Sequence, residues 1–516
     1  MSTPLLLASH AEGRWLAAGG GAELVSAVNG ETVALMPREA VNAGAMLRYG
    51  REVGGTALRK LTLAERGKLL RKLADVLSAR KEELYELSYA TGATRNDSAF
   101  DIEGGLGVLF SYASKAKALP ESHVLIDGDR EAISKGNFAG QHIFTPLQGV
   151  AVHINAYNFP VWGMLEKLAP TLLAGMPAIV KPGTVTAWPT AAAFRIMIES
   201  GVLPEGAVQL LLGSTGDMFD HLDAQDCVAF TGSAATAAKL RTHPNVIRES
   251  VRFNAEQDSL NCSILGTDAT ASTPEFDLFI KEVVREMTQK AGQKCTAIRR
   301  VLVPAALIDE VEKALVSRLA RTTVGDPRAE GVRMGALAGR SQRKDVLDNI
   351  AKLKAEARVV SGDAPLALQG ADANKGAFVA PTLLRCDAPA TAKLVHEVEA
   401  FGPVSTLMPY SDAAQAAEIA RAGKGSLVMS LFTHDPQVVR EVILQAASSH
   451  GRMLIVDRDS AADSTGHGAA LPHLLHGGPG RAGGGEELGG LAGAKRYMQR
   501  TAIQAAPVTL DAMAGF

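Results

Sequence analysis

The chain has 516 residues, 47 % of them hydrophobic, and its 53 Lys and Arg against 55 Asp and Glu leave a formal charge of −2. This material is enough for several large cores, and the 51 Gly and 23 Pro follow no period, so collagen-like and disordered classes are excluded. The charge balance gives no basic field for nucleic acid or for an anionic membrane surface, and we expect neither as a partner.

Cysteine usage and the amino terminus favour a cytoplasmic protein. The cysteines lie far apart and form no CxxC pair of the kind found in zinc or thioredoxin-like sites. They are Cys227, Cys262, Cys295 and Cys386. The first residues lack the basic region of a secretory signal, and no apolar run reaches about 18 residues, so we expect no transmembrane helix. In a reducing compartment, a cysteine outside a core strand is a candidate nucleophile.

The first clear helix is predicted at 62–88. Thr62 and Glu65 form a capping-box pattern, and leucines recur after them at helical spacing. An amphipathic helix that covers a domain explains this pattern without any functional role. Farther along the chain, the pattern of residues 122–146 predicts a hairpin of two strands.

From residue 149 the chain alternates between short apolar runs and helices. Helices are predicted after Pro160 and after Pro189. The runs that we interpret as strands are 149–154, 177–182, 208–213 and 227–232. Strands that are apolar on both faces and separated by helices indicate βαβ units in a parallel, Rossmann-like sheet, which binds ligands beyond the carboxyl ends of its strands.

A second α/β region is predicted from about 259 to 480. Its first helix opens at Thr273-Pro274, and Gly292 is its expected stop. Residues 466–494 are so rich in glycine, and so long for a turn, that we expect a functional or mobile loop.

Three histidines in this glycine-rich segment raise the question of a metal. They are His467, His473 and His476. Their spacing fits no familiar zinc pattern, and no carboxylate or thiol completes a ligand set beside them, so we expect no metal site.

Six short motifs occur in a fixed order along the chain. They are NAYNFP (155–160), KPGT (181–184), FTGS (230–233), NAEQDS (254–259), GQKC (292–295) and EAFGPV (399–404). Each motif alone is weak, but the set in this order resembles the aldehyde dehydrogenase superfamily over nearly the whole chain. The resemblance implies an α/β fold with a Rossmann-like cofactor domain, an α/β catalytic domain and a small strand subdomain for oligomerisation.

The resemblance also implies domain boundaries. The cofactor domain takes residues 1–126 and 146–258, the catalytic domain residues 259–480, and the oligomerisation subdomain residues 127–145 and 481–516. Because that subdomain pairs across subunits in the family, we expect a homodimer or a larger homo-oligomer. Its exposed strand edges would otherwise pair non-specifically.

Cys295 is the candidate nucleophile. It lies in AGQKCTA, which has no apolar strand pattern to bury it, whereas Cys227 and Cys262 lie in apolar runs typical of inert core thiols. Lys294 beside it is expected to lower the pKa of the thiol. The alternative is an ordinary loop cysteine. The resemblance implies that the sulfur attacks an aldehyde carbon to form a thiohemiacetal.

Asn158 and Glu256 are the other catalytic candidates. By local rules Asn158 would only cap the following helix, and Glu256 would be a solvated surface glutamate. The resemblance implies instead an oxyanion-hole donor and the general base that activates water. The sequence reads Glu256-Gln257-Asp258-Ser259 where the family has E-L-G-G, and Asp258 is a rival carboxylate for the base.

The candidate cofactor residues follow the predicted strands. Small residues at strand ends suit a pyrophosphate held at helix N-termini. They are Gly213, Gly216, Gly232 and Ser233. By resemblance, Lys181 reaches the adenosine ribose and Glu399 holds the nicotinamide ribose; a solvated charge and a salt-bridge partner are the alternatives. Thr184 stands where NAD-preferring members often have a glutamate, so we predict NADP as the cofactor.

A narrower resemblance concerns residues 476–490 and 495–504, which are similar to aldehyde dehydrogenases of aerobic benzoate and phenylacetate degradation. It implies oxidation of a CoA-linked semialdehyde, such as 3,4-dehydroadipyl-CoA semialdehyde, to the acid. The chain ends at Phe516 without room for the hydratase domain of the phenylacetate fusion proteins, so the stand-alone type is expected. Two alternatives stay open: CoA-acylating dehydrogenation, and a non-catalytic binding or structural protein on the same scaffold.

Overall fold

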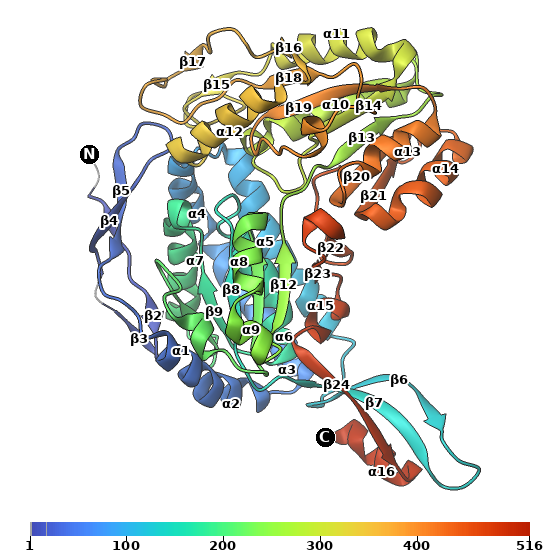
Figure 1. Ribbon diagram of the computed structural model, residues 1–516. Coiled ribbons are helices and arrows are strands. Elements are labelled where there is room, and N and C mark those ends of the chain that lie inside the picture. The colour runs from blue at the N-terminus through green and yellow to red at the C-terminus, as the bar shows by residue number, and fades with distance from the viewer. Residues whose placement is uncertain (1–2, 17) are drawn as a thin grey trace.

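Two seven-stranded sheets with their helices form the two bodies of the molecule, and a three-stranded arm projects from the lower body (Figure 1). The computed structural model describes residues 3–16 and 18–516. The helices of the lower body and the arm are α1 (Ala43–Tyr49), α2 (Thr56–Arg59), α3 (Leu63–Ala79), α4 (Lys81–Ser88), α5 (Arg95–Ala116), α6 (Trp162–Ala174), α7 (Ala187–Glu199), α8 (Ala234–Arg241), α9 (Pro244–Arg248), α15 (Leu491–Lys495) and α16 (Pro507–Ala512). Those of the upper body are α10 (Pro274–Thr288), α11 (Ile308–Leu319), α12 (Arg340–Leu353), α13 (Ala413–Arg421) and α14 (Pro436–Ala446). Within the described residues, no helix combines the length and the apolar character needed to cross a membrane.

The sheet of the lower body has the strand order of a dinucleotide-binding fold. Its strands, in spatial order, are β12 (Arg252–Glu256), β11 (Cys227–Thr231), β8 (Ala151–Ile154), β9 (Ala178–Lys181), β10 (Val208–Leu210), β2 (His10–Ala11) and β3 (Arg14–Trp15). The first five are parallel, and β8 comes first along the chain, so the spatial order is 5-4-1-2-3. The chain therefore adds β9 and β10 on one side of β8 and then crosses back to add β11 and β12 on the other side. The four predicted strands are confirmed, each shorter than its apolar run.

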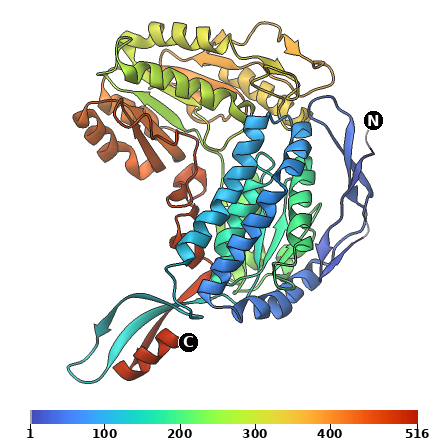
Figure 2. The same cartoon turned by 180° about the vertical axis from the view of Figure 1, so that it is seen from behind.

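Helices cover this sheet on the face seen from behind, where the segment 63–116 crosses it (Figure 2). The helix predicted at 62–88 is in fact two helices. Thr62 and Glu65 form the predicted capping box, but Arg80 leaves the helical conformation (φ −113°, ψ 15°) and α4 begins after it. The break turns the chain so that Leu73 of α3 and Leu84 of α4 lie in the same core.

The upper body contains the second seven-stranded sheet. Its strands, in spatial order, are β16 (Arg358–Ser361), β18 (Thr382–Arg385), β19 (Val404–Tyr410), β14 (Arg300–Pro304), β13 (Cys262–Leu265), β20 (Ser426–Phe432) and β21 (His450–Val456). Only β16 at the edge is antiparallel to its neighbour. Helix α10 begins at Pro274, as predicted, but ends at Thr288, and a 3-10 turn then leads to Gly292. A small pair, β15 (Val324–Gly325) and β17 (Leu368–Gln369), lies beside the sheet.

The glycine-rich segment 466–494 is not an open loop. It contains the antiparallel pair β22 (Leu475–Gly477) and β23 (Glu486–Leu488), followed by α15. Figure 1 shows this segment, in red, running down between the upper body and the arm. Contacts of β23 with α6 and β12 attach it to the lower body.

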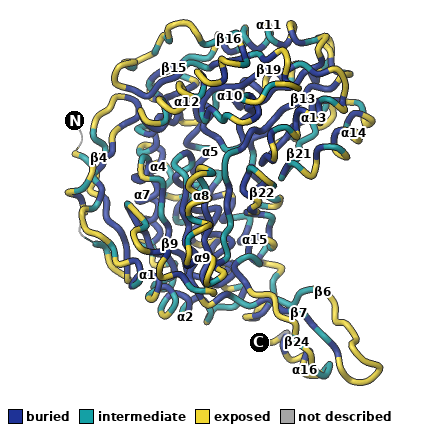
Figure 3. The backbone as a smooth tube through the Cα atoms, in the orientation of Figure 1, coloured by how far each residue is buried: buried dark blue, intermediate teal, exposed yellow. Residues whose placement is uncertain are grey.

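The arm consists of β6 (Leu125–Ala132), β7 (Ala139–Pro146) and β24 (Met498–Ala505). All pairs are antiparallel, which confirms the predicted hairpin and adds the carboxyl-terminal strand to it. Figure 3 shows that the hairpin tip is exposed. At the amino-terminal edge, β1 (Leu5–Leu6), β5 (Thr32–Pro37) and β4 (Gly20–Val25) form a further small sheet. The domain boundaries and the joining of subunits by the arm stay predictions.

Candidate active site

The candidate active site lies beyond the carboxyl ends of β8 and β11, where the first sheet reverses its order. A cavity of about 490 Å³ extends from there toward the upper body. A second pocket adjoins it, with aromatic walls from Phe100, Phe159 and Trp162. The residues that line both are Ala156, Asn158, Thr231, Glu256 and Cys295. The structure therefore brings the three predicted catalytic residues together at the junction of two pockets.

A strained turn presents Cys295 to this junction. Lys290, Ala291 and Gly292 all have positive φ angles, of 55°, 50° and 69°. A non-glycine residue in the left-handed region costs on the order of 1–3 kcal/mol, so surrounding contacts must hold the turn. The amide of Lys290 donates to Asp97 Oδ1 at 2.8 Å. A Cβ on Gly292 would lie 2.1 Å from a backbone oxygen of the upper body, so only glycine fits there.

Two side chains fix the backbone around the sulfur. The guanidinium of Arg299 donates to the carbonyl oxygens of Gly292 at 2.9 Å and Lys294 at 3.2 Å. Asn261 Nδ2 donates to the carbonyl oxygen of Cys295 at 2.7 Å. The position of Cys295 is thus set from both sides of its peptide segment.

The expected influence of Lys294 on Cys295 was wrong. The buried Lys294 Nζ is bound to Glu286 Oε1 at 2.6 Å and to Gln289 Oε1 at 2.9 Å, so its charge is already paired. Burial raises the pKa of the Cys295 thiol well above its usual value, and the carboxylate of Glu256 raises it further. The surroundings of Cys295 therefore favour the neutral thiol over the thiolate.

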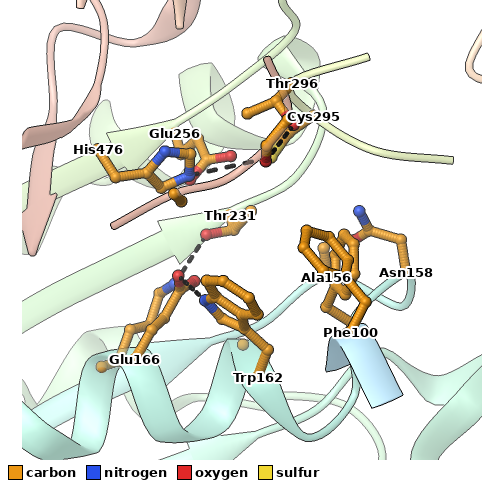
Figure 4. A pocket seen from close by; sticks show the side chains of 15 residues that line it. Phe100, Ala156, Asn158, Trp162, Glu166, Thr231, Glu256, Cys295, Thr296 and His476 are labelled. Carbon is orange, nitrogen blue, oxygen red and sulfur yellow. Dashed lines mark hydrogen bonds and ion pairs between the residues drawn. The ribbon is translucent and has the colours of Figure 1, made fainter. Parts of the chain in front are cut away.

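Glu256, the last residue of β12, shares an ion pair with a histidine that sequence reasoning had set aside. Its Oε2 lies 3.0 Å from Nε2 of His476, and the two residues are 3 % and 5 % exposed. The same Nε2 lies 3.9 Å from Cys295 Sγ (Figure 4). Burial alone would raise the pKa of Glu256, but the charge and hydrogen bond of His476 lower it to about 2. Burial alone would lower the pKa of His476, but Glu256 raises it to about 9.

The sequence neighbourhood of His476 contains no thiol, yet the fold brings both a thiol and a carboxylate to it. Sγ of Cys295, a carboxylate oxygen of Glu256 and a ring nitrogen of His476 lie within 4.8 Å of one another. The fold therefore brings to His476 a carboxylate and a thiol that its sequence neighbourhood did not indicate, and the expectation of no metal site stays a prediction. The signal that could have found His476 is its place in a segment already expected to be functional.

Glycine allows that segment to reach Glu256. Gly483 has φ +109°, and a Cβ there would lie 2.3 Å from the carbonyl oxygen of Ala255. The amide of Gln257 donates to the carbonyl oxygen of Ala482 at 3.0 Å. The residues after Glu256 lack the glycines of the usual motif, and the close backbone approach is made from the glycine-rich segment instead.

A buried charged cluster, which the sequence analysis missed, lies next to Glu256 and lines part of the aromatic pocket. Lys167 Nζ lies 3.1 Å from Glu166 Oε1, 3.1 Å from Glu487 Oε2 and 2.9 Å from Thr231 Oγ1. Trp162 donates to Glu166 at 2.8 Å. Adjacent charges at 166 and 167 within an otherwise apolar helix were the available signal, because a buried charge needs a partner.

Asn158 points toward the segment of the nucleophile. Its Nδ2 donates to the carbonyl oxygen of Gln293 at 3.0 Å, which leaves its second N–H free. No described residue accepts a hydrogen bond from the backbone N–H of Cys295. Two donors are thus available beside the sulfur, as an oxyanion hole requires.

The predicted cofactor residues divide into two groups. Gly232, Ser233 and Glu399 line the large cavity, whereas Lys181 and Thr184 do not. Lys181 ends β9, so it lies at the same edge of the sheet. Gly213 and Gly216 follow β10 and have positive φ angles. A Cβ on either glycine would meet no atom of the described residues within 4 Å, so the space above them is open.

Glu399 and Asp258 hold defined positions in the large cavity. Glu399 Oε2 accepts from the amide of Ser259 at 3.2 Å, and burial raises the pKa of Glu399 to about 7. Asp258 Oδ1 accepts from the amide of Ala234 at 3.1 Å, at the start of α8. Glu256, and not Asp258, is the carboxylate grouped with Cys295.

Comparisons with known proteins agree with the motifs. Residues 17–503 match the model of the aldehyde dehydrogenase family. The chain is 46 % identical over 477 residues to 3,4-dehydroadipyl-CoA semialdehyde dehydrogenase of Aromatoleum evansii, covering 92 % of this chain and 93 % of that one. It is 29 % identical over 389 residues to alpha-ketoglutaric semialdehyde dehydrogenase of Bacillus subtilis, covering 74 % and 75 %. A crystal structure of a point mutant of Staphylococcus aureus betaine aldehyde dehydrogenase with NAD+ matches it with a TM-score of 0.83 at 23 % identity, over 97 % of this chain and 98 % of that one, which shows a shared fold.

Proposed function

The chain belongs to the aldehyde dehydrogenase family, and from this we propose that it oxidises a CoA-linked semialdehyde to the carboxylic acid with NADP as hydride acceptor. The observation that carries the proposal is the junction of two pockets at Cys295, with Asn158 and Glu256 lining both. The aromatic pocket suits the carbon chain next to an aldehyde. The large cavity at the sheet's reversal is where a dinucleotide binds in such folds.

In the proposed first step, Cys295 attacks the aldehyde carbon as a thiolate and forms a thiohemiacetal. The negative oxygen receives hydrogen bonds from the free N–H of Asn158 and from the backbone N–H of Cys295. Each such donor is typically worth about 3–4 kcal/mol of barrier. The fixed backbone around Cys295 keeps both donors in place before the substrate arrives.

The lining of the large cavity fits a nicotinamide dinucleotide. Gly232 and Ser233 precede the N-terminus of α8, open space lies above Gly213 and Gly216, and Glu399 lines the cavity. When bound, the cofactor supplies the acceptor for the hydride that leaves the thiohemiacetal carbon. The chain itself then holds a thioester on Cys295, and Glu256 takes a proton from the water that hydrolyses it.

The CoA-linked substrate is supported by the relative from Aromatoleum evansii, whose name states that substrate. CoA-acylating dehydrogenation is the alternative, and Glu256 beside Cys295 argues against it, because a CoA thiol in place of water needs no such base. We propose likewise that the arm joins subunits into a homodimer or larger assembly and that the protein works in the cytoplasm.

A substrate panel tests the proposed function. Assays of NADP reduction with CoA-linked semialdehydes and with the matching free semialdehydes should give the higher kcat/KM for the CoA-linked compounds. The product should be the acid whether or not free CoA is added. A new CoA thioester formed only with free CoA would support the acylating reaction, and equal kcat/KM for both substrate types would overturn the CoA-linked assignment.

Cys295→Ala should abolish turnover while cofactor binding persists, because only the covalent step is removed. Turnover is followed by NADP reduction and binding by quenching of protein fluorescence. Cys386→Ala is the matched control, since Cys386 is a buried free thiol of the upper body. Turnover of Cys295→Ala within tenfold of the parent enzyme would contradict the role of the sulfur.

Glu256→Gln should separate the two half-reactions. Glutamine keeps the shape of the side chain but accepts no proton from the hydrolytic water. Hydride transfer should still occur once per site, because the Cys295 thiol can lose its proton to solvent beside His476, and the acyl-enzyme should then accumulate. General-base assistance is typically worth about 100- to 10,000-fold in rate. The measurement is a burst of reduced cofactor together with the intact mass of the adduct. If Asp258→Asn shows this behaviour and Glu256→Gln does not, Asp258 is the base.

Thr184→Glu tests the cofactor preference. A neutral hydroxyl at 184 can donate to a 2′-phosphate and Lys181 adds positive charge nearby, whereas a glutamate would repel the phosphate. Hydrogen bonds to charged groups are worth about 1.5–3 kcal/mol, so we expect an NADP preference of about ten- to a hundredfold in kcat/KM. The variant should shift this ratio toward NAD. A parent enzyme that prefers NAD, or an unchanged ratio in the variant, would place recognition of the 2′-phosphate elsewhere.

A further inference from the structure

One ring nitrogen of His476, Nε2, lies near both Glu256 and Cys295. This Nε2 lies 3.0 Å from Oε2 of Glu256 and 3.9 Å from Sγ of Cys295. Figure 4 shows the ring beside Glu256, with both groups turned toward the sulfur. Because one nitrogen contacts both groups, a charge on this ring acts on the base and on the nucleophile at once.

We propose that His476 is a third catalytic residue of this centre, an imidazolium that serves Glu256 and Cys295 in turn as their counter-ion. The proposal rests on the proposed function of these two residues and extends it. It assigns a chemical role to the glycine-rich segment, which carries His476 into the site on β22.

The groups around His476 favour the protonated ring. Glu256 faces it from β12, Glu487 from β23 and Glu166 from α6, and all three act to hold its proton. Lys167 is bound to Glu166 and Glu487, so Glu256 is left to the histidine. The opposing effect of burial is outweighed, and the pKa of His476 rises to about 9. Together with the 3.0 Å ion pair to Glu256, this favours the charged ring.

The counter-ion gives the negative charge of the centre a partner both before and after the activation of Cys295. The resting centre holds a thiol, a carboxylate and an imidazolium. Activation breaks the S–H bond of Cys295 and forms an O–H bond on Glu256, and the imidazolium then pairs with the thiolate instead of the carboxylate. Glu256 must release this proton to solvent before it can take one from the hydrolytic water. The net charge of the three groups is zero before and after the transfer. Without His476, the same step would leave an unpaired thiolate in a buried site that also contains Glu166 and Glu487.

This arrangement predicts opposite effects for two variants on the ionisation of Cys295. His476→Gln removes the cation and should raise the pH at which half of the Cys295 thiol is ionised, which we call the midpoint. Glu256→Gln removes the anion and leaves the imidazolium without its partner, so it should lower the midpoint. An opposite charge within about 4–6 Å typically shifts a pKa by about 1–3 units, so alkylation of His476→Gln at pH 7 should be at least about tenfold slower.

The measurement is the pH dependence of alkylation by iodoacetamide, a neutral probe, in the full-length protein without cofactor. Cys295→Ser gives the background, because the other three cysteines are buried. His473→Gln is the matched control, since His473 is an exposed histidine of the same segment and should leave the midpoint unchanged. The conservative variant His476→Lys keeps a positive charge at this position. Its midpoint should therefore lie between that of the parent protein and that of His476→Gln.

An unchanged midpoint in folded His476→Gln would overturn the proposal. If that variant fails to fold, Glu256→Gln decides alone: a midpoint below that of free cysteine, about 8.5, requires a cation beside a buried thiol, and a midpoint above it refutes the shared counter-ion. Alkylation needs no substrate. A shift without aldehyde oxidation would therefore reject the proposed function and keep the counter-ion, and oxidation without a shift would do the reverse.

Discussion

The buried carboxylate of Glu256 imposes the constraint on which the centre depends. A charge removed from water costs several kcal/mol unless a partner compensates for it. His476 is that partner, and it comes from a segment more than two hundred residues away in the sequence. The segment reaches Glu256 only because its backbone passes directly against β12, and this close approach requires glycine at 483. The electrostatics of one side chain thus explain the composition of a long stretch of chain.

The same reasoning applies to the charged groups around Glu256. Three carboxylates, including Glu256, and two cations share one buried region. Glu166 and Glu487 are held by Lys167, and Glu256 by His476. Because each cation already has its partners, the loss of one would leave a carboxylate without compensation. The base is therefore supported by packing and charge together, and Glu166, Lys167 and His476 also line the aromatic pocket.

Local patterns in the sequence predicted the parts of the structure that local rules govern. The four strands from 149 to 232, the capping box at Thr62 and the start of α10 at Pro274 follow from periodicity and end signals. The break at Arg80 did not, because it depends on which helices α3 and α4 meet in the core. The role expected of Lys294 failed for a similar reason: adjacency in sequence gives no direction for a long side chain, and Lys294 turns to Glu286. His476 was set aside because its partners are brought to it by the fold.

The strained turn at 290–292 has a mechanical consequence. Lys290 is held through its amide by Asp97 of the lower body, while Gly292 lies against the backbone of Gly402 in the upper body. The segment 290–292, which precedes Cys295 in the chain, is thus fixed by contacts to both bodies within three residues. A hinge motion between the bodies would therefore shift this segment and displace the Cys295 sulfur from Asn158. We therefore expect a large cofactor and a long substrate to enter through movements of side chains and loops at the rims of the two pockets, with the two bodies keeping their relative positions.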